Sequence, residues 1–361
     1  SKEFRKKIRN FDFISRYGGD EFVIVLNHID DKFTIVKKLE ELIEAAGSVF
    51  CWKKHDISIG ASIGVALYPE HGEDYRLLVK NADSAMYLAK NAGKNRFRFF
   101  SDELNQQVLR RSVIEQDMSG TLHNNGFDVY YQPFYDMSDK SIVGAEALIR
   151  WKHKDLGFIS PEEFIAIAES NGMINEIGLW VLDKVMELHQ EHPQLRIAIN
   201  VSSIQFRNKK LFERLQDYIQ EGRLNPFKLE LEITERLLIE DLHLEDHYMV
   251  KISELGFSCS IDDFGTGYSS LNQLKNCPIS TLKIDKSFVF PLPSEQDGIL
   301  CTTIIAMAKA LGMDIVAEGI ETEEQFTFLQ SEGCHIAQGY YLARPMPKEN
   351  FVKLLESEET P

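Results

Sequence analysis

Acidic, amide and basic side chains stand at the carboxyl ends of seven separate apolar stretches of this chain. They are Glu146, Asn200, Glu232, Asp262 with Asp263, Lys283, Glu318 and Gln338. In a β/α barrel every strand delivers its last residues to one rim, and the chemistry lies on that rim. Carboxylates that converge there repel one another unless cations are present. The set therefore indicates one or two hard divalent metal ions held by oxygen ligands.

The apolar stretches are typical of strands that are covered on both faces, because they are short and rich in Ile, Val, Leu and aromatic residues. We expect eight strands, at 128–132, 143–149, 195–200, 228–233, 257–262, 281–285, 313–317 and 335–338. Helical patterns lie between them at 161–191, 203–221, 244–255, 297–311 and 322–332. Strands that alternate with helices form a parallel sheet, and eight such units predict a closed (β/α)8 TIM-like barrel. An open doubly wound sheet has much the same pattern and stays the alternative.

Residues 1–100 have a different α/β pattern. Apolar stretches at 13–16 and 22–26 flank Gly18-Gly19-Asp20-Glu21, and glycines between two strands predict a tight hairpin. Helices are expected at 31–46 and 74–92, with a strand at 57–67. The polar segment 101–120 is helical in type and predicts a linker helix, which leaves 121–361 for the barrel domain.

Length and charge limit the classes of function. A chain of 361 residues is too long for one ordinary core, so two domains are expected. The formal net charge is −16, with 56 acidic and 40 basic residues. This charge argues against sequence-independent binding to DNA or RNA, which requires a basic face. It does not exclude an anionic substrate, because bound metal ions reverse the local field.

The five cysteines are odd in number, form no CxxC pair and stand in apolar surroundings. They are typical of reduced core residues in a cytoplasmic protein. The sequence contains no run of about 18 apolar residues, so no membrane-spanning segment is predicted. It shows no recognisable signal peptide either. Because the chain starts at Ser1 within a helical pattern, we expect an upstream part to be missing.

The motifs of the barrel region resemble those of the EAL domain, a phosphodiesterase family that acts on the bacterial messenger cyclic di-GMP. In chain order they are Glu146-Ala147-Leu148 with Arg150-Trp151, Asn200-Val201-Ser202, Glu232-Ile233-Thr234-Glu235, Asp262-Asp263-Phe264-Gly265-Thr266-Gly267-Tyr268-Ser269-Ser270-Leu271, Lys283-Ile284-Asp285, Ala317-Glu318-Gly319-Ile320-Glu321 and Gln338-Gly339-Tyr340. One tripeptide is not specific, whereas seven ordered motifs at expected strand ends are. The first region resembles the later half of a GGDEF domain, the cyclase partner of that family, through Gly18–Phe22, Ala82-Asp83, Met86-Tyr87, Ala89-Lys90, Gly93, Asn95 and Arg96.

The resemblance implies hydrolysis of cyclic di-GMP to linear pGpG with two Mg²⁺ or Mn²⁺ ions per barrel. It implies that the first ion is held by Glu146, Asn200, Glu232 and Asp262. It implies that Asp262, Asp263 and Glu318 serve the second. Two ions about 3.5–4 Å apart activate a water and stabilise the leaving oxygen. Lys283 is a cation suited to orienting that water or to neutralising the phosphorane.

Four further residues are expected to bind substrate. The guanidinium of Arg150 suits phosphate oxygens, and the resemblance adds Gln132, Asp285 and Gln338. Phe134 departs from the family, which usually has a smaller aliphatic residue there, so packing near the first strand is expected to change.

A mobile loop is expected at 263–270, because Gly265 and Gly267 reach conformations that other residues avoid. Glu235 is expected to pin this loop through Thr266, Ser269 or Ser270, and so to support catalysis without touching metal. The helix near 268–274 resembles the surface through which EAL barrels pair. We therefore expect a homodimer through the barrel, in which pairing orders the loop and raises activity.

Other interpretations of these residues remain open. Glu146 would pair with Arg150 as a buried acid, Asn200 and Gln338 would cap helices, and Lys283 would be a structural partner of Asp285 or Asp263. Arg9 and Asp12 precede Gly18 as in the inhibitory product site of the cyclase family, or form an ion pair at a helix end.

Three functions fit the sequence. The first is an active phosphodiesterase, and the second is a receptor that binds cyclic di-GMP without cleaving it. The third is a bifunctional enzyme whose cyclase half is completed upstream. Because the first half of the GGDEF domain is missing, we expect that part to be regulatory and not cyclase-competent in this chain.

Overall fold

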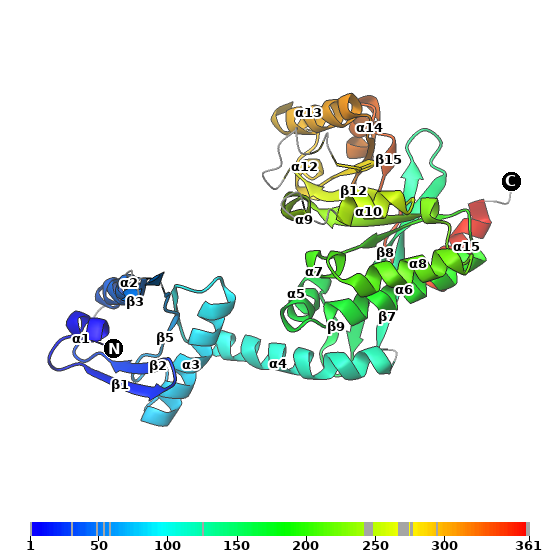
Figure 1. Cartoon of the computed structure of the whole chain (residues 1–361). Coiled ribbons are helices and arrows are strands. Elements are labelled where there is room, and N and C mark those ends of the chain that lie inside the picture. Colours follow the sequence, from blue (N-terminus) through cyan, green and yellow to red (C-terminus); the bar gives the residue numbers. More distant parts are fainter. Residues whose placement is uncertain are drawn as a thin grey trace. The chain divides into compact units, whose positions relative to one another are not determined.

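A computed structural model of the chain describes residues 2–29, 32–47, 50–52, 55–57, 59–124, 126–241, 248–265, 274, 277–293 and 295–358. The chain divides into two compact units, residues 1–116 and 117–361. Helix α4 (Asp102–His123) contributes residues to both (Figure 1). Among the described helices, none has both the length and the apolar character that a membrane crossing requires.

The second unit is a closed barrel of eight strands. They are β7 (Phe127–Asp136), β8 (Ile142–His153), β10 (Arg196–Asn200), β11 (Leu229–Thr234), β12 (Ser258–Phe264), β13 (Thr281–Ile284), β14 (Asp314–Ala317) and β15 (Ile336–Ala337). Their hydrogen-bonded order is β7-β15-β14-β13-β12-β11-β10-β8, and the pairing of β7 with β8 closes the ring. The expected barrel is confirmed, and the open sheet is excluded.

The first strand departs from the parallel pattern expected from the sequence. β7 runs antiparallel to both of its neighbours, β8 and β15. Only residues 137–141 separate β7 from β8, and a parallel crossover needs a dozen or more residues, so the two strands form a hairpin. Its register places Gln132 directly opposite Glu146.

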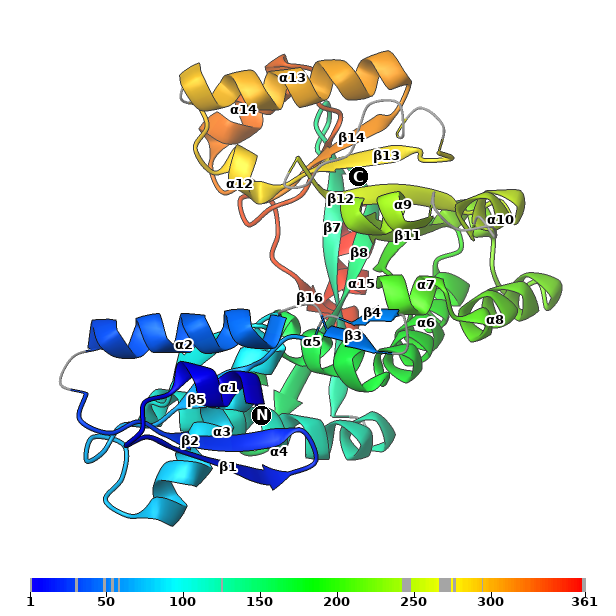
Figure 2. The same ribbon diagram turned by 60° about the vertical axis from the view of Figure 1, so that its left-hand side comes forward.

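The helices lie on the outer side of the strands (Figures 1 and 2). They are α5 (Pro161–Asn171), α6 (Ile174–Glu191), α7 (Ser203–Phe206), α8 (Lys209–Gln220), α9 (Glu235–Asp241), α10 (Tyr248–Glu254), α12 (Lys286–Val289), α13 (Glu295–Leu311), α14 (Glu323–Ser331) and α15 (Lys348–Glu358). Three short elements complete the unit: β9 (Gly157–Ile159), β16 (Met346–Pro347) and the 3-10 turn η1 (Pro226–Lys228).

Two of the long helices expected from the sequence are interrupted. The helix expected at 161–191 stops at Gly172, whose φ of 83° ends α5 in a left-handed cap. The helix expected at 203–221 breaks before Asn208, whose side chain accepts a hydrogen bond from the Lys210 N–H and caps α8.

The side chains inside the barrel form layers, because alternate residues of a strand point to opposite faces. The layer at the amino-terminal end is polar, and the Arg196 side chain donates to Glu230 at 2.6 Å and to Thr281 at 2.9 Å. The next layer is a small apolar cluster, formed by Phe134, Ala198 and Val316. The rim lies above it. The large hydrophobic core between strands and helices is a separate cluster that surrounds the barrel.

The first unit contains the expected hairpin, formed by β1 (Phe13–Gly18) and β2 (Glu21–Val25) with Gly19 at a φ of 47°. Its other elements are α1 (Lys2–Lys7), α2 (Lys32–Gly47), β3 (Phe50–Trp52), β4 (His55–Ile57), β5 (Ile63–Val65), α3 (Tyr75–Asn91) and β6 (Phe97–Phe99). The strand expected at 57–67 is shorter in the structure. β4 ends at Ile57, where it pairs with β3, and β5 covers only Ile63–Val65.

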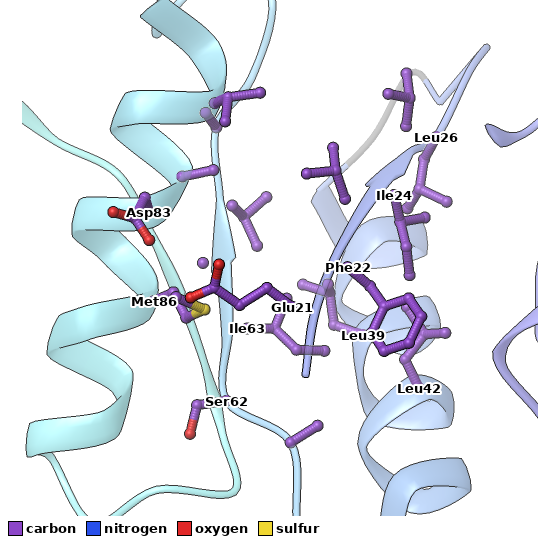
Figure 3. A pocket seen from close by; sticks show the side chains of 18 of the residues that line it. Glu21, Phe22, Ile24, Leu26, Leu39, Leu42, Ser62, Ile63, Asp83 and Met86 are labelled. Atoms are coloured by element: carbon purple, nitrogen blue, oxygen red, sulfur yellow. The ribbon is translucent and has the colours of Figure 1, made fainter. Parts of the chain in front are cut away.

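A wide apolar groove opens between β2 and β5 (Figure 3). It has a volume of about 2570 Å³, and its walls include Phe22, Ile24, Leu39 and Ile63. β2 pairs with β1 and β5 with β6, and no second partner of either strand exists among the described residues. This volume is well above the ~300–1,000 Å³ of a small-molecule pocket, so we assign no ligand to the groove.

Candidate active site

Lys283 stands at the centre of the barrel rim, surrounded by four carboxylates. Its Nζ lies 2.6 Å from Glu318, 2.7 Å from Glu232, 3.4 Å from Asp262 and 3.6 Å from Glu146. The side chains of Lys283 and Glu232 are each only 1% exposed. Five strands or strand ends supply these residues, as expected for a barrel rim. Its ion pairs join Lys283 to these four carboxylates at once, which favours a role in a shared site over a structural pairing with Asp285 or Asp263.

Two amides hold Glu146 in place, and a third contacts one of them. The Asn200 Nδ2 donates to one of its carboxylate oxygens at 2.6 Å, and the Gln338 Nε2 donates to the other at 2.8 Å. Gln338 also donates to the Gln132 Oε1 at 3.1 Å. Asn200 and Gln338 thus face the site, whereas Ser202 caps the helix after β10. No ion pair joins Glu146 to Arg150 among the described residues.

Asp262 and Asp263 reach the same site although they are adjacent in sequence. Neighbouring side chains of a regular strand point to opposite faces. Here the pairing of β12 with β13 shifts register between Ile261 and Phe264, and Asp263 has a φ of 54°. This bulge turns the second carboxylate, so that ligand atoms of Asp262, Asp263 and Glu318 lie within 4.8 Å of one another.

The site holds more negative charge than one lysine can balance. Burial, and then the charge of Glu146, raises the pKa of Glu232 well above its ordinary value. Burial raises the pKa of Glu318 to about 8, and burial together with Asp262 raises that of Asp263 to about 6. Burial also opposes ionisation of Glu146, but Lys283 and the two amides lower its pKa. Lys283 stays protonated, because the carboxylates outweigh burial and raise its pKa.

The residues present fit hard divalent cations. The donor atoms are carboxylate and amide oxygens, which Mg²⁺ and Mn²⁺ prefer. The Gln338 Oε1 is buried and accepts no hydrogen bond from the described part of the chain. Such an orphaned acceptor beside Glu146 suits a ligand or a water at this position.

Asp285 and Glu235 stand where helices begin, directly after β13 and β11. Asp285 caps α12, since its carboxylate accepts from the Ser287 N–H at 3.1 Å and from the Ser287 hydroxyl. Glu235 is the first residue of α9 and is buried. Its expected partners Thr266, Ser269 and Ser270, and almost all of the pairing segment 268–274, lie outside the described residues.

Two arginine–tyrosine pairs flank the rim. The guanidinium of Arg150 lies 5.8 Å from the ring centre of Tyr130, and that of Arg344 lies 4.2 Å from the ring centre of Tyr340. Burial lowers the pKa of Arg150, while Glu146 and Tyr340 oppose this shift, which places both groups near the guanidinium. Sequence reasoning named Arg150 but missed Tyr130 and Arg344, because neither lies in a motif.

The side chains of Arg9 and Asp12 make separate contacts. Asp12 is buried, and its carboxylate accepts from the backbone N–H groups of Arg9 at 2.8 Å and Asn27 at 3.0 Å. The Arg9 guanidinium lies 5.6 Å from the ring centre of Phe11. No ion pair joins the two side chains in the described ranges. Asp12 therefore fixes the turn before β1, and an inhibitory site at these residues stays a prediction.

The fold and the site define an α/β barrel with an oxygen-rich rim for divalent cations. The EAL domain model matches residues 115–345, and the model described as "Diguanylate cyclase, GGDEF domain" matches residues 1–96. The chain belongs to the EAL domain family, joined to a GGDEF region, as the sequence motifs predicted.

Several known proteins are similar over the full length of this chain. The bifunctional diguanylate cyclase/cyclic di-GMP phosphodiesterase MucR of Pseudomonas aeruginosa is 37% identical over 98% of this chain and 52% of its own length. The cyclic di-GMP phosphodiesterase NbdA of the same organism is 34% identical over 100% of this chain and 47% of its own length. The chain thus spans about half the length of these relatives. The solved structure "PaMucR Phosphodiesterase, c-di-GMP complex" is 38% identical, with a TM-score of 0.63 over 66% of this chain and 99% of that one.

Proposed function

We propose that this chain is a metal-dependent phosphodiesterase that hydrolyses cyclic di-GMP to linear pGpG. The observation that carries the proposal is the complete rim, in which Glu146, Glu232, Asp262 and Glu318 surround Lys283. The names of MucR and NbdA support the substrate, since both include cyclic di-GMP phosphodiesterase. A receptor that only binds is disfavoured, because every ligand position of the expected metal set carries an oxygen donor.

The proposed metal ligands are the two sets that the family resemblance implies, and the grouping of Asp262, Asp263 and Glu318 supports the second set. Glu146, Asn200, Glu232 and Asp262 would hold one ion, and Asp262, Asp263 and Glu318 the other. Two bound Mg²⁺ or Mn²⁺ ions supply a hydroxide at neutral pH and stabilise the leaving oxygen of an in-line displacement. Asn200 donates its Nδ2 to Glu146 and so keeps its carbonyl oxygen for this role.

The remaining residues bind and orient the substrate. Lys283 is held charged at the centre of the rim, where it orients the attacking water and offsets charge on the phosphorane. Arg150 offers a guanidinium fork to a phosphate oxygen. Gln132 and Gln338 present amides beside Glu146. Asp285 and Glu235 act in support, Asp285 at the start of α12 and Glu235 through the loop after β12.

We infer further that the chain works in the cytoplasm as a homodimer through the barrel, and that its GGDEF region regulates without cyclase activity. Incubation with GTP and Mg²⁺ should yield no cyclic di-GMP. Detection of that product from purified protein would favour the bifunctional alternative.

The decisive experiment identifies the product. Purified protein is incubated with cyclic di-GMP and Mg²⁺ or Mn²⁺, and pGpG is expected. A chelator should stop the reaction, and added metal should restore it. Asp262→Asn and Glu146→Ala should abolish turnover and keep the fold, since both lie on the rim and outside the main core. Tight binding of intact cyclic di-GMP without any product would instead indicate a receptor.

A further inference from the structure

Tyr340 is a large aromatic side chain that the barrel leaves open to solvent at its catalytic rim. Its side chain is 51% exposed. It stands two residues after Gln338, whose amide contacts Glu146. The Arg344 guanidinium covers the ring at 4.2 Å from its centre. A single exposed aromatic ring needs no explanation by itself, but a ring fixed by an arginine beside a charged site does.

The backbone around Tyr340 is held on both sides. The Ile320 N–H donates to the Gln338 carbonyl at 3.2 Å, and the Tyr341 N–H donates to the Ile320 carbonyl at 3.0 Å. Between these bonds lies Gly339, where a Cβ atom would meet the Ile320 oxygen at 2.1 Å.

The far side of this segment is tied to β7. The Gln132 Nε2 donates to the Ala343 carbonyl at 3.1 Å, and the Ala343 N–H donates to the Gly339 carbonyl at 3.0 Å. Tyr340 is therefore carried by a rigid segment with a fixed distance to Glu146. A preorganised aromatic side chain of this kind loses little entropy when it binds a ligand.

We propose that Tyr340 is the stacking platform for one purine base of the dinucleotide substrate, with Arg344 as the positioning residue behind its ring. This inference rests on the proposed function and names a substrate-binding residue of the same site.

The chemistry of the substrate matches the two pairs on the rim. A cyclic dinucleotide of guanosine carries two flat bases and two phosphates. Tyr340 has one face against Arg344, and half of its side chain is exposed, so the ring has surface on which a base could stack. Stacking on an aromatic ring tolerates any base, and it strengthens when a cation lies behind the ring. Arg150, near Tyr340, supplies the charge for a phosphate.

The test compares a substrate that has purines with one that has none. Steady-state kinetics with Mn²⁺ are measured on cyclic di-GMP and on bis(p-nitrophenyl) phosphate, for the parent chain, Tyr340→Ala, Tyr340→Phe and Arg344→Met. Tyr340→Ala should raise KM for cyclic di-GMP about 5- to 100-fold. The kcat of this variant on cyclic di-GMP should equal that of the parent. Its kcat/KM for bis(p-nitrophenyl) phosphate, which has no purine, should also equal the parent value. Tyr340→Phe keeps the ring and should keep the parent KM. Arg344→Met should raise KM by a smaller factor, about 2- to 5-fold.

Phe227→Ala is the matched control, because Phe227 is a 74% exposed aromatic residue in η1, which precedes β11 at the opposite end of the barrel. Its kinetics should equal those of the parent. An unchanged KM in Tyr340→Ala, or an equal loss on both diesters, would overturn the stacking role.

The failure of this inference differs from failure of the proposed function. If the parent chain binds cyclic di-GMP without cleaving it, the same fold-changes are expected in Kd from calorimetry. If the parent binds and cleaves while Tyr340→Ala behaves identically, only the stacking platform is wrong. If the parent neither binds nor cleaves cyclic di-GMP, both proposals fall together.

Discussion

Lys283→Met should destabilise the metal-free chain strongly. Lys283 is the only ammonium described within 4 Å of Glu146, Glu232, Asp262 and Glu318. Methionine keeps most of the volume but removes the charge. The four carboxylates would then repel one another at close range, in a site that is almost closed to water.

The magnitude follows from the burial of the partners. Removing one member of a buried ion pair costs about 3–5 kcal/mol, because the other charge is left without a partner. For a unit of this size, 1 kcal/mol shifts Tm by about 2–4 °C, so the expected loss is about 6–20 °C in a chelating buffer. Saturating Mn²⁺ at 100-fold above its Kd should recover about 2.7 kcal/mol, since the ion replaces the missing positive charge.

The loss should also depend on pH. Burial raises the pKa of Glu318 from 4.5 to about 8. Between these two pH values the carboxyl group is protonated in the folded chain and ionised in the unfolded chain. Stability of the metal-free chain therefore falls as pH rises through this window. Without Lys283 more carboxylates must take up protons in the folded chain. The variant should therefore lose more stability, relative to the parent, at pH 8 than at pH 6.

Thermal unfolding of parent and variant, with chelator or Mn²⁺ at pH 6 and pH 8, measures all three effects. Lys353→Met is the control, because it removes the same charge from an exposed position in α15. An equal Tm for parent and Lys283→Met in chelator at pH 8 would refute the charge-balance argument.

Three further predictions follow from the same geometry. Affinity for Mn²⁺ in calorimetry should rise from pH 6 to pH 8, since burial raises the pKa of Asp263 to about 6 and only ionised carboxylates bind metal; a flat profile would exclude these ligands. Glu235→Ala should lower turnover and weaken metal binding, although Glu235 does not contact the metal. Unchanged turnover and metal affinity would contradict the loop-coupling model. A specific activity that stays constant while dilution converts dimers to monomers would contradict it as well. Phe134→Ala should cost about 3–5 kcal/mol of unfolding free energy in denaturant titration, because Phe134 fills the barrel beneath the rim between Ala198 and Val316.

The rim was predictable from the sequence because a barrel converts strand ends into neighbours. Apolar stretches followed by polar residues place Asn200, Glu232 and Lys283 on one edge without any knowledge of contacts, and the structure brings them together. The direction of β7 was not predictable in the same way. Its apolar composition is equal for a parallel and an antiparallel strand, and only the short connection at 137–141 reveals the hairpin.

Local backbone conformation was the other limit. Asp263 adopts a φ of 54°, which residue type alone does not require, since the bulge in β12 depends on pairing with β13. Helix breaks at Gly172 and Asn208 carry local signals, a glycine and an N-cap residue, that the longer apolar periodicity obscured. Tertiary pairing and capping therefore decide what periodicity leaves open.

The layers inside the barrel explain why the rim carries such perturbed acids. Phe134, Ala198 and Val316 form an apolar layer beneath the rim, and Glu232 and Lys283 above it are each only 1% exposed. Phe134 is the largest side chain of this layer, and Ala198 is the smallest. A closed floor strengthens each electrostatic interaction above it, which raises both the cost of an unbalanced carboxylate and the gain from a bound cation. The apolar layer and the excess of acids thus work together, since a solvated rim with the same acids would have ordinary pKa values and a weaker demand for metal.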